Sequence, residues 1–236
     1  MSRMLARRAG AELVALAMPV VIVAVMVAFF FNPAYVALEQ DRAQADAWTG
    51  FTRDEVHTVT NSVLDQIYLG PPSFDQAVGG QPVFDLRERA HLADVRTVLL
   101  GLGLVTLIAA AILAVVGAAS RGAGWYWRAV RRGATALALL IVAGGVLFAF
   151  AFDAMFDLFH RVFFAGGSYT FDPRTERLVQ LFPAKFWTDT SIALAVVGLV
   201  LCLVVRRLAG RRATEPPDSR PVATPGSLSS SLEDAR

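Results

Sequence analysis

Histidines are the side chains in this sequence best suited to proton transfer, and two of the three histidines lie near long apolar runs. His91 lies six residues before the apolar run 97–119. His160 lies eight residues after the apolar run 134–152. At a rise of about 1.5 Å per residue, a straight helix would place each imidazole roughly 10 Å beyond its apolar run, at the depth of lipid headgroups and glycerol esters. This spacing predicts that two histidines from different helices meet in one layer, close to the acyl esters of membrane lipids.

Carboxylates stand beside both histidines at helical spacing. Asp153, Asp157 and His160 recur at i, i+4 and i+7, so they would share one face of a helix. By the same rule, Asp94 shares a face with His91. A carboxylate beside an imidazole can fix its tautomer and raise its basicity, which suits a general base. A polar stretch of this kind can equally be a solvated helix end, and the residues alone leave both interpretations open.

The remaining reactive side chains are weaker candidates. His57 falls off the apolar stripe of its own predicted helix, which favours a solvated side chain. The single cysteine, Cys202, lies within an apolar run and is more simply a small packing residue. The sequence contains neither a G-x-S-x-G nucleophile elbow nor an H-E-x-x-H zinc motif. We therefore expect no enzyme nucleophile, no metal and no cofactor.

Four apolar runs must position these groups, and each is expected to form a transmembrane helix. The runs are 11–31, 97–119, 134–152 and 189–205. A helix needs about 20 residues to cross about 30 Å of hydrocarbon. The last run is shorter, but Phe186 and Trp187 extend it if they act as interfacial anchors. The chain of 236 residues is 55% hydrophobic, which is too apolar for an ordinary soluble domain. The sequence predicts an all-α integral membrane protein with four transmembrane helices and a small extracytoplasmic cap formed by two outer loops.

The arginines predict the orientation of the helices. They cluster in segments 1–10, 120–133 and 206–236, which all lie on one side of a four-span arrangement. The positive-inside rule makes that side the cytoplasm, so both termini are expected there and both histidines on the outer side of the membrane. The tail within 206–236 is expected to be disordered. Because the net charge of +2 averages two unlike faces, it does not indicate nucleic-acid binding.

The two outer segments, 32–96 and 153–188, carry local patterns of their own. One stripe of an amphipathic helix is formed by Val56, Val59, Val63 and Ile67. Asp85 and Glu88 form a D-x-x-E helix start, from which a helix would continue into the second span. Segment 153–188 is rich in aromatic residues and is expected to lie along the membrane surface.

Glycine pairs lie inside two of the apolar runs. They are Gly101 with Gly103, and Gly144 with Gly145. Small residues in a transmembrane helix often permit close contact between helices. We expect that role for them, and not a role in phosphate binding.

Several different short motifs lie near the ends of the apolar runs and in the two outer segments. In chain order they are Phe31-Asn32-Pro33 with Tyr35, Val63-Leu64-Asp65 with Tyr68-Leu69, His91-Leu92-Ala93-Asp94-Val95-Arg96, Phe156-Asp157-Leu158-Phe159-His160 with Phe163-Phe164, Phe171-Asp172-Pro173, and Leu181-Phe182-Pro183 with Phe186 and Asp189. In their order and spacing between four spans, these motifs resemble those of the bacterial lipoprotein intramolecular transacylases. The resemblance extends over most of residues 11–205.

The resemblance implies an extracytoplasmic active site with two histidines, which His91 and His160 match. It also implies a reaction. A diacylglyceryl lipoprotein would donate its sn-2 acyl chain from the glycerol to its own N-terminal cysteine amine, giving a lyso-form lipoprotein. The expected partners are therefore membrane lipid and this lipoprotein.

Roles at this site follow as hypotheses. We expect His160 to act as the base, polarised by Asp157 or Asp153, and His91 to stabilise the oxyanion. Tyr35 and Arg96 are expected to position the substrate. Two alternatives remain open: a non-catalytic membrane scaffold that binds lipid or a partner through its outer surface, and an acyltransferase acting between two lipids.

Overall fold

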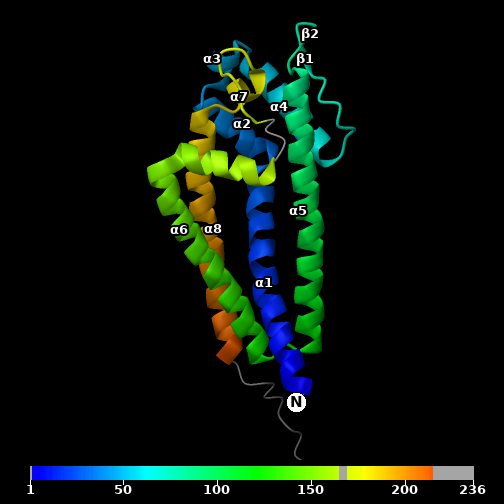
Figure 1. Ribbon diagram of the computed structural model, residues 1–236, viewed down its shortest axis with the longest axis vertical. Coiled ribbons are helices and arrows are strands. Elements are labelled where there is room, and N and C mark those ends of the chain that lie inside the picture. Colours follow the sequence, from blue (N-terminus) through cyan, green and yellow to red (C-terminus); the bar gives the residue numbers. More distant parts are fainter. Residues whose placement is uncertain (1, 165–168, 215–236) are drawn as a thin grey trace, which may run out of the picture.

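The computed structural model describes residues 2–164 and 169–214. The described part of the chain contains four long helices: α1 (Ser2–Phe30), α5 (Leu86–Ala119), α6 (Gly124–Phe163) and α8 (Ala184–Thr214). Helix α1 packs against each of the other three, with α5 on one side of it and α6 and α8 on the other (Figure 1). Each of the four is long and apolar enough to cross a membrane, which confirms the predicted four-span architecture.

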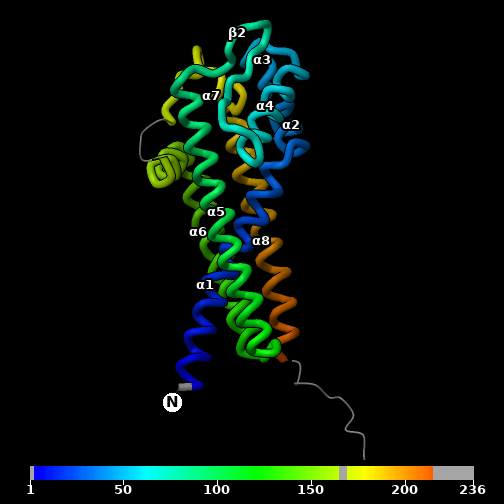
Figure 2. Tube along the Cα trace, turned by 90° about the vertical axis from the view of Figure 1, so that its right-hand side faces the viewer, coloured from blue at the N-terminus to red at the C-terminus, as the bar shows by residue number. Residues whose placement is uncertain are grey.

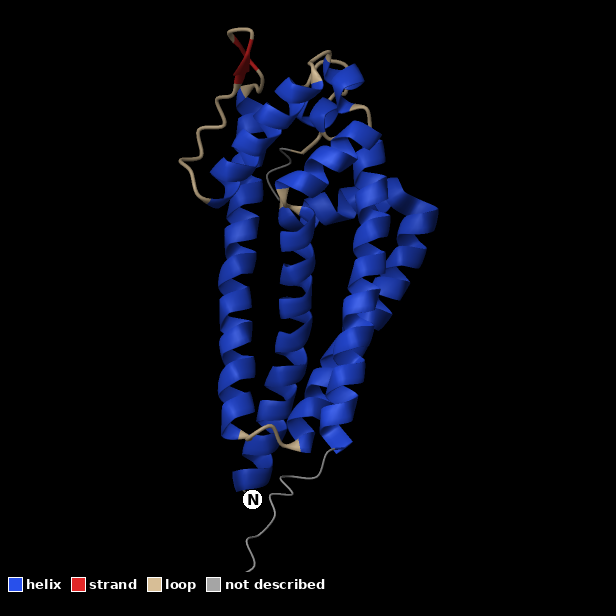
Figure 3. Ribbon diagram, turned by 180° about the vertical axis from the view of Figure 1, so that it is seen from behind, coloured by secondary structure: helices blue, strands red, loops and turns tan. Residues whose placement is uncertain are grey.

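A small cap of short elements covers the end of the bundle opposite the N-terminus (Figure 3). It consists of α2 (Pro33–Arg42), α3 (Ala45–Thr49), α4 (Arg53–Tyr68), the antiparallel pair β1 (Ala77–Val78) and β2 (Gln81–Pro82), and α7 (Arg177–Leu181). The predicted apolar stripe lies on α4, where all four of its residues are buried. Leu178 and Leu181 of α7 complete the same core. The cap therefore joins two segments that are far apart in the sequence.

Helix α5 runs without interruption from the cap into the bundle. Asp85 caps its N-terminus, and a reciprocal pair of hydrogen bonds with Glu88 completes a capping box. This satisfies backbone N–H groups that the first turn cannot pair internally. The helix start that the D-x-x-E pattern predicts is thus present, and His91 lies near this capped end.

Helix α6 bends sharply at Ala151, where φ is −147° and ψ is 48°. The residues after the bend lie across the long axis of the bundle (Figures 1 and 2). The expectation that this helix continues straight to His160 is therefore wrong. After Ala151, the helix carries the charged residues Asp153 and Asp157 among aromatic and other apolar residues. A helix with one apolar and one charged face lies most stably along a membrane interface.

The glycine pairs do not make the close helix contacts that we expected. A Cβ atom built on any of the four would meet no atom of another described helix or loop within 4 Å. Close approach occurs instead at Gly133, whose Cβ would lie 2.5 Å from the carbonyl oxygen of Ala15, and at Gly198, whose Cβ would lie 2.6 Å from Met26. The expected disorder of segment 206–236 is wrong for its first part, because α8 continues as a helix to Thr214. The rest of that segment, residues 215–236, lies outside the described residues.

Candidate active site

His91 of α5 and His160 of α6 face each other where the crosswise part of α6 reaches α5. Their ring centroids are 6.1 Å apart and their planes are inclined by only 24°. The residues are 7% and 8% exposed, respectively. Two polar rings are thus withdrawn from water and held within reach of one small group between or beside them.

Aromatic rings enclose this pair. Ring centroids of Phe164 and Phe171 lie 4.8 Å and 5.4 Å from that of His91. The ring of Phe156 lies 4.1 Å from that of His160. These rings exclude water, which strengthens electrostatic interactions between the imidazoles and anything bound there.

One hydrogen bond settles the tautomer of His160. Its Nδ1 lies 2.7 Å from the carbonyl oxygen of Phe156. A carbonyl oxygen can only accept, so Nδ1 carries the proton and Nε2 presents its lone pair. The Nδ1 atom of His91 differs, because it is buried and has no hydrogen-bond partner within the described part of the chain. A buried polar atom without a partner costs about 1–3 kcal/mol, so this atom is suited to contact a substrate.

Both imidazoles are neutral near pH 7. Burial, followed by the neighbouring His160, lowers the pKa of His91 to about 4, and Asp94 only partly opposes this shift. Burial also lowers the pKa of His160, against the opposing effects of the Phe156 carbonyl and Asp157. A neutral imidazole can accept a proton directly, as a general base must.

The carboxylates beside His160 do not occupy the position expected for a direct partner. Asp157 forms an ion pair of 2.7 Å with Arg161 and accepts a hydrogen bond of 3.2 Å from the Tyr169 hydroxyl. Asp153 is exposed. The hydrogen bond to Nδ1 of His160 comes from a main-chain carbonyl, so Asp157 acts on this ring only through space.

Tyr35 and Arg96 are held by contacts within the protein. The Tyr35 hydroxyl donates a hydrogen bond of 3.0 Å to the Thr190 hydroxyl. The Arg96 guanidinium donates to the carbonyl oxygens of Gln66 and Ile67, at the end of α4. These contacts tie α2 to α8 and α4 to α5, and they do not join either residue to the histidines.

An ion pair that the sequence did not reveal supports the wall beside His91. Arg87 pairs with Glu176, and its guanidinium carbon lies 5.3 Å from the ring centroid of Phe171. Glu176 also accepts a hydrogen bond from the backbone N–H of Asp172. Phe171 is the ring that meets His91 edge-on. Arg87 stands one turn before His91, but nothing in its local sequence identifies Glu176 as its partner.

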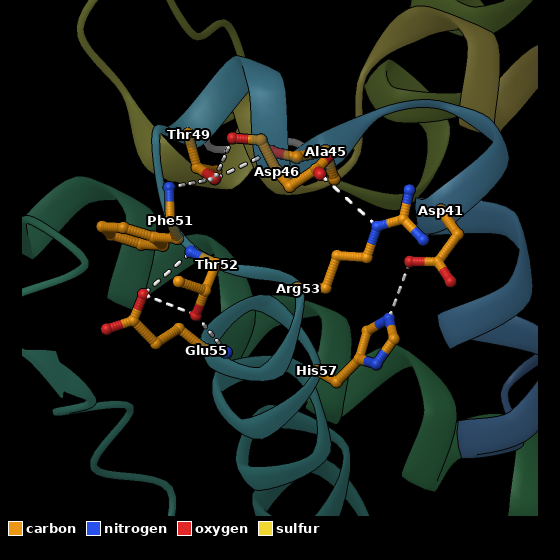
Figure 4. A network of polar contacts seen from close by, with 9 residues as sticks. All are labelled: Asp41, Ala45, Asp46, Thr49, Phe51, Thr52, Arg53, Glu55 and His57. Atoms are coloured by element: carbon orange, nitrogen blue, oxygen red, sulfur yellow. Dashed lines mark hydrogen bonds and ion pairs between the residues drawn. The ribbon is translucent and has the colours of Figure 1, made fainter.

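His57 belongs to a separate polar network in the cap (Figure 4). Its Nε2 lies 3.1 Å from the Asp41 carboxylate, and its side chain is 27% exposed. Arg53 pairs with Asp46 in the same network, at 3.5 Å. These contacts join α4 to α2 and α3, so His57 helps to hold the cap together. Its side chain remains partly solvated.

The described residues contain no group of three or more histidine, cysteine, aspartate or glutamate side chains placed to hold a metal ion. The site consists instead of two neutral imidazoles in an aromatic enclosure. Such a pair can take a proton at one ring and donate a hydrogen bond from the other, and acyl transfer uses both actions.

Comparison with known proteins identifies relatives with a described activity. The family model described as lipoprotein intramolecular transacylase Lit matches residues 12–187. No curated protein matches the sequence. The solved structure of the lipoprotein intramolecular transacylase Lit from Bacillus cereus is similar, with a TM-score of 0.73 at 18% identity, over 90% of this chain and 98% of that chain.

Two variants of the Bacillus cereus protein, in which a histidine is replaced by arginine or by alanine, are also similar. Their TM-scores are 0.68 and 0.70, at 18% and 17% identity. Both alignments cover 89% of this chain and 94% of that chain.

Proposed function

Because this chain belongs to the lipoprotein intramolecular transacylase family, we propose that His91 and His160 are the residues that catalyse its reaction. The protein is a multi-pass membrane acyltransferase that converts a diacylglyceryl lipoprotein into a lyso-form lipoprotein. The sn-2 acyl chain moves from the glycerol to the N-terminal cysteine amine of the same molecule. Because the family consists of enzymes, its match argues against the alternative of a non-catalytic scaffold. The observation that carries the proposed site is the buried, stacked pair of neutral imidazoles.

His160 is the base in this proposal. Its Nδ1 proton is held by the Phe156 carbonyl, so the lone pair of Nε2 is available to the cysteine amine. As the amine nitrogen bonds to the ester carbonyl carbon, Nε2 takes the proton that nitrogen loses. When the bond from carbon to the glycerol oxygen breaks, His160 returns that proton to the departing alkoxide. The ring ends as it began, and no other proton source is needed.

His91 stabilises the negative charge that develops on the ester oxygen. A neutral imidazole with a low pKa can donate one hydrogen bond without first being protonated, and an oxyanion is a strong acceptor. The buried Nδ1 of His91 supports this role, because it has no hydrogen-bond partner among the described residues and is suited to contact a ligand. No enzyme nucleophile is required, since donor ester and acceptor amine share one molecule and are already close together.

The substrate lipid approaches from the side of the bundle between α5 and α6. Helix α5 packs mainly on α1, whereas α6 packs mainly on α8 and α1, so α5 and α6 share few contacts. Exposed apolar side chains, Phe150, Leu158 and Val162, lie near or on the crosswise part of α6. An acyl chain can remain among such side chains while its ester reaches the histidines.

The arginine-rich end of the bundle faces the cytoplasm, and the histidines face the outside. The N-terminus, the α5–α6 connection and the end of α8 lie together at one end (Figure 1), and these segments carry the arginine clusters. The positive-inside rule supports this orientation. Both termini are then cytoplasmic, and the site opens at the outer leaflet.

Mass spectrometry of the N-terminal lipopeptide of a reporter lipoprotein tests the proposed site. Co-expression with the wild-type chain should give a peptide that is N-acylated and de-acylated on glycerol. His91→Ala and His160→Ala should each leave a diacylglyceryl peptide with a free amine. His57→Ala is the matched control, because it removes a histidine from the cap and should leave conversion intact. Undiminished conversion by a folded His91→Ala or His160→Ala protein would overturn the assignment.

A further inference from the structure

A cavity lies at the end of the bundle opposite the histidine pair. It has a volume of about 380 Å³ and lies between the first turns of α1 and the first turns of α6. This end also holds the N-terminus and the α5–α6 connection (Figures 1 and 2). None of the proposed catalytic side chains lines this cavity, so a binding function of the cavity does not depend on the proposed catalytic roles.

The lining of this cavity is strongly basic. It includes the side chains of four arginines: Arg7, Arg8, Arg128 and Arg132. Arg132 pairs with Glu12 at 2.7 Å. Within residues 2–164 and 169–214, no ion pair joins any of the other three arginines to a carboxylate. The cavity therefore carries about three uncompensated positive charges.

The start of α6 adds to the positive potential of the cavity. The helix begins at Gly124 and has no side-chain cap, so the backbone N–H groups of its first turn donate no hydrogen bond to a capping side chain. The N-terminus of a helix carries a partial positive charge, which favours an anion nearby. Trp125 and Arg128, in the first turns of this helix, both line the cavity.

Part of the cavity lining is apolar. Ala11, Trp125 and Ala129 line it together with the arginines. These three residues also belong to, or pack against, the buried cluster between α1 and α6. The Trp125 ring lies so close to α1 that a Cβ on Gly10 would approach it to 3.3 Å. The cavity thus combines arginine side chains with an apolar wall of Ala11, Trp125 and Ala129, which joins the apolar cluster between the helices.

We propose that this cavity binds the headgroup of an anionic phospholipid. Arginine guanidinium groups bind phosphate oxygens in pairs, and basic pockets between transmembrane helices suit anionic headgroups. Free inorganic phosphate shares this chemistry. The apolar wall favours the lipid, because an acyl chain can pack along it while the phosphodiester meets the arginines, whereas free phosphate gains nothing from that wall.

Native mass spectrometry of the full-length protein in detergent tests this site, with phosphatidylglycerol and phosphatidylcholine as probes. The wild-type protein should retain phosphatidylglycerol at least about tenfold more tightly than phosphatidylcholine. Arg7→Gln/Arg128→Gln should lower the affinity for phosphatidylglycerol by about tenfold or more. The matched control is Arg206→Gln/Arg207→Gln, which removes the same charge from exposed positions on α8 outside the cavity and should keep wild-type affinity.

Three outcomes would overturn the proposal. One is equal retention of the two lipids by the wild-type protein, which needs no variant to fold. A second is the same loss of affinity in both double variants, because this indicates a diffuse charge effect. The third is displacement of phosphatidylglycerol by millimolar inorganic phosphate at constant ionic strength, which assigns the cavity to free phosphate.

Discussion

Glu88, one turn before His91 in α5, accepts a hydrogen bond of 2.7 Å from the backbone N–H of Leu178 in α7. Its other carboxylate oxygen accepts the N–H of Asp85 at the start of α5. Glu88 is 2% exposed. This one buried carboxylate therefore holds α5 to the segment that follows Phe171, and it fixes the relative position of His91 and the wall beside it.

Replacing Glu88 should loosen this connection. In Glu88→Gln, the amide NH₂ can only donate, so one of the two backbone N–H groups loses its acceptor. The loss should cost about 1–3 kcal/mol and lower the thermal unfolding midpoint in detergent. Glu55→Gln is the control, since Glu55 holds the same position in the capping box of α4 but bonds only to Thr52. Equal shifts in the two variants would contradict a special role for the contact with Leu178.

The histidine pair should make stability depend on pH between about 4 and 6.5. The folded state lowers the pKa of His91 to about 4, below the 6.5 of an unperturbed histidine, so the unfolded state binds more protons in this window. Stability is therefore fully present above pH 6.5 and falls as the pH falls. The loss attributable to His91 should reach roughly 1–3 kcal/mol near pH 4.

Unfolding midpoints measured at pH 7, 6 and 5 check this dependence. His91→Gln should flatten the decline, because its side chain does not titrate. An unchanged slope in His91→Gln would show that the pair does not cause the effect.

Arg87 should affect the rate of acyl transfer more than stability. Its guanidinium is half exposed, and although Glu176 is nearly buried, a glutamine at position 87 can still donate a hydrogen bond to that carboxylate, so the loss of stability should be small. It also covers Phe171, the ring against His91. Arg87→Gln should slow conversion of the reporter lipoprotein by about tenfold, because small misplacements at a site reduce rates strongly. Arg53→Gln breaks the ion pair with Asp46 in the cap and should leave the rate unchanged, so equal slowing would contradict this role.

Gly133 should be the glycine at which α1 and α6 cannot tolerate a side chain. In Gly133→Ala, the new methyl group would lie 2.5 Å from the carbonyl oxygen of Ala15, which forces the helices apart. We expect a loss of about 1–3 kcal/mol, measured as a lower unfolding midpoint. Gly145→Ala is the matched control in the same helix. Its methyl group meets open space, so the midpoint should stay or rise slightly through better helix propensity. The reverse order would contradict the close approach at Gly133.

Several features could be predicted from the sequence because they depend on neighbouring residues only. Hydrophobic length defines the four long helices, and the pair Asp85 and Glu88 marks the start of α5. The glycine contacts show the opposite case. Gly144 and Gly145 carry the more conspicuous pattern, yet Gly133 and Gly198 make the close approaches. Which face of a helix meets its neighbour depends on packing across the bundle, which spacing along one helix does not specify.

By itself, the sequence determined that four apolar helices cross the membrane and that two of them carry a histidine near one end, because both properties follow from the length and order of segments. Only the tertiary structure decided how those histidines are held. The bend at Ala151 carries His160 sideways to His91, burial lowers the pKa of both rings, and the hydrogen bond to Nδ1 comes from the Phe156 carbonyl and not from an aspartate. These features arise where α5, α6 and the cap pack together, so they depend on contacts between segments distant in sequence.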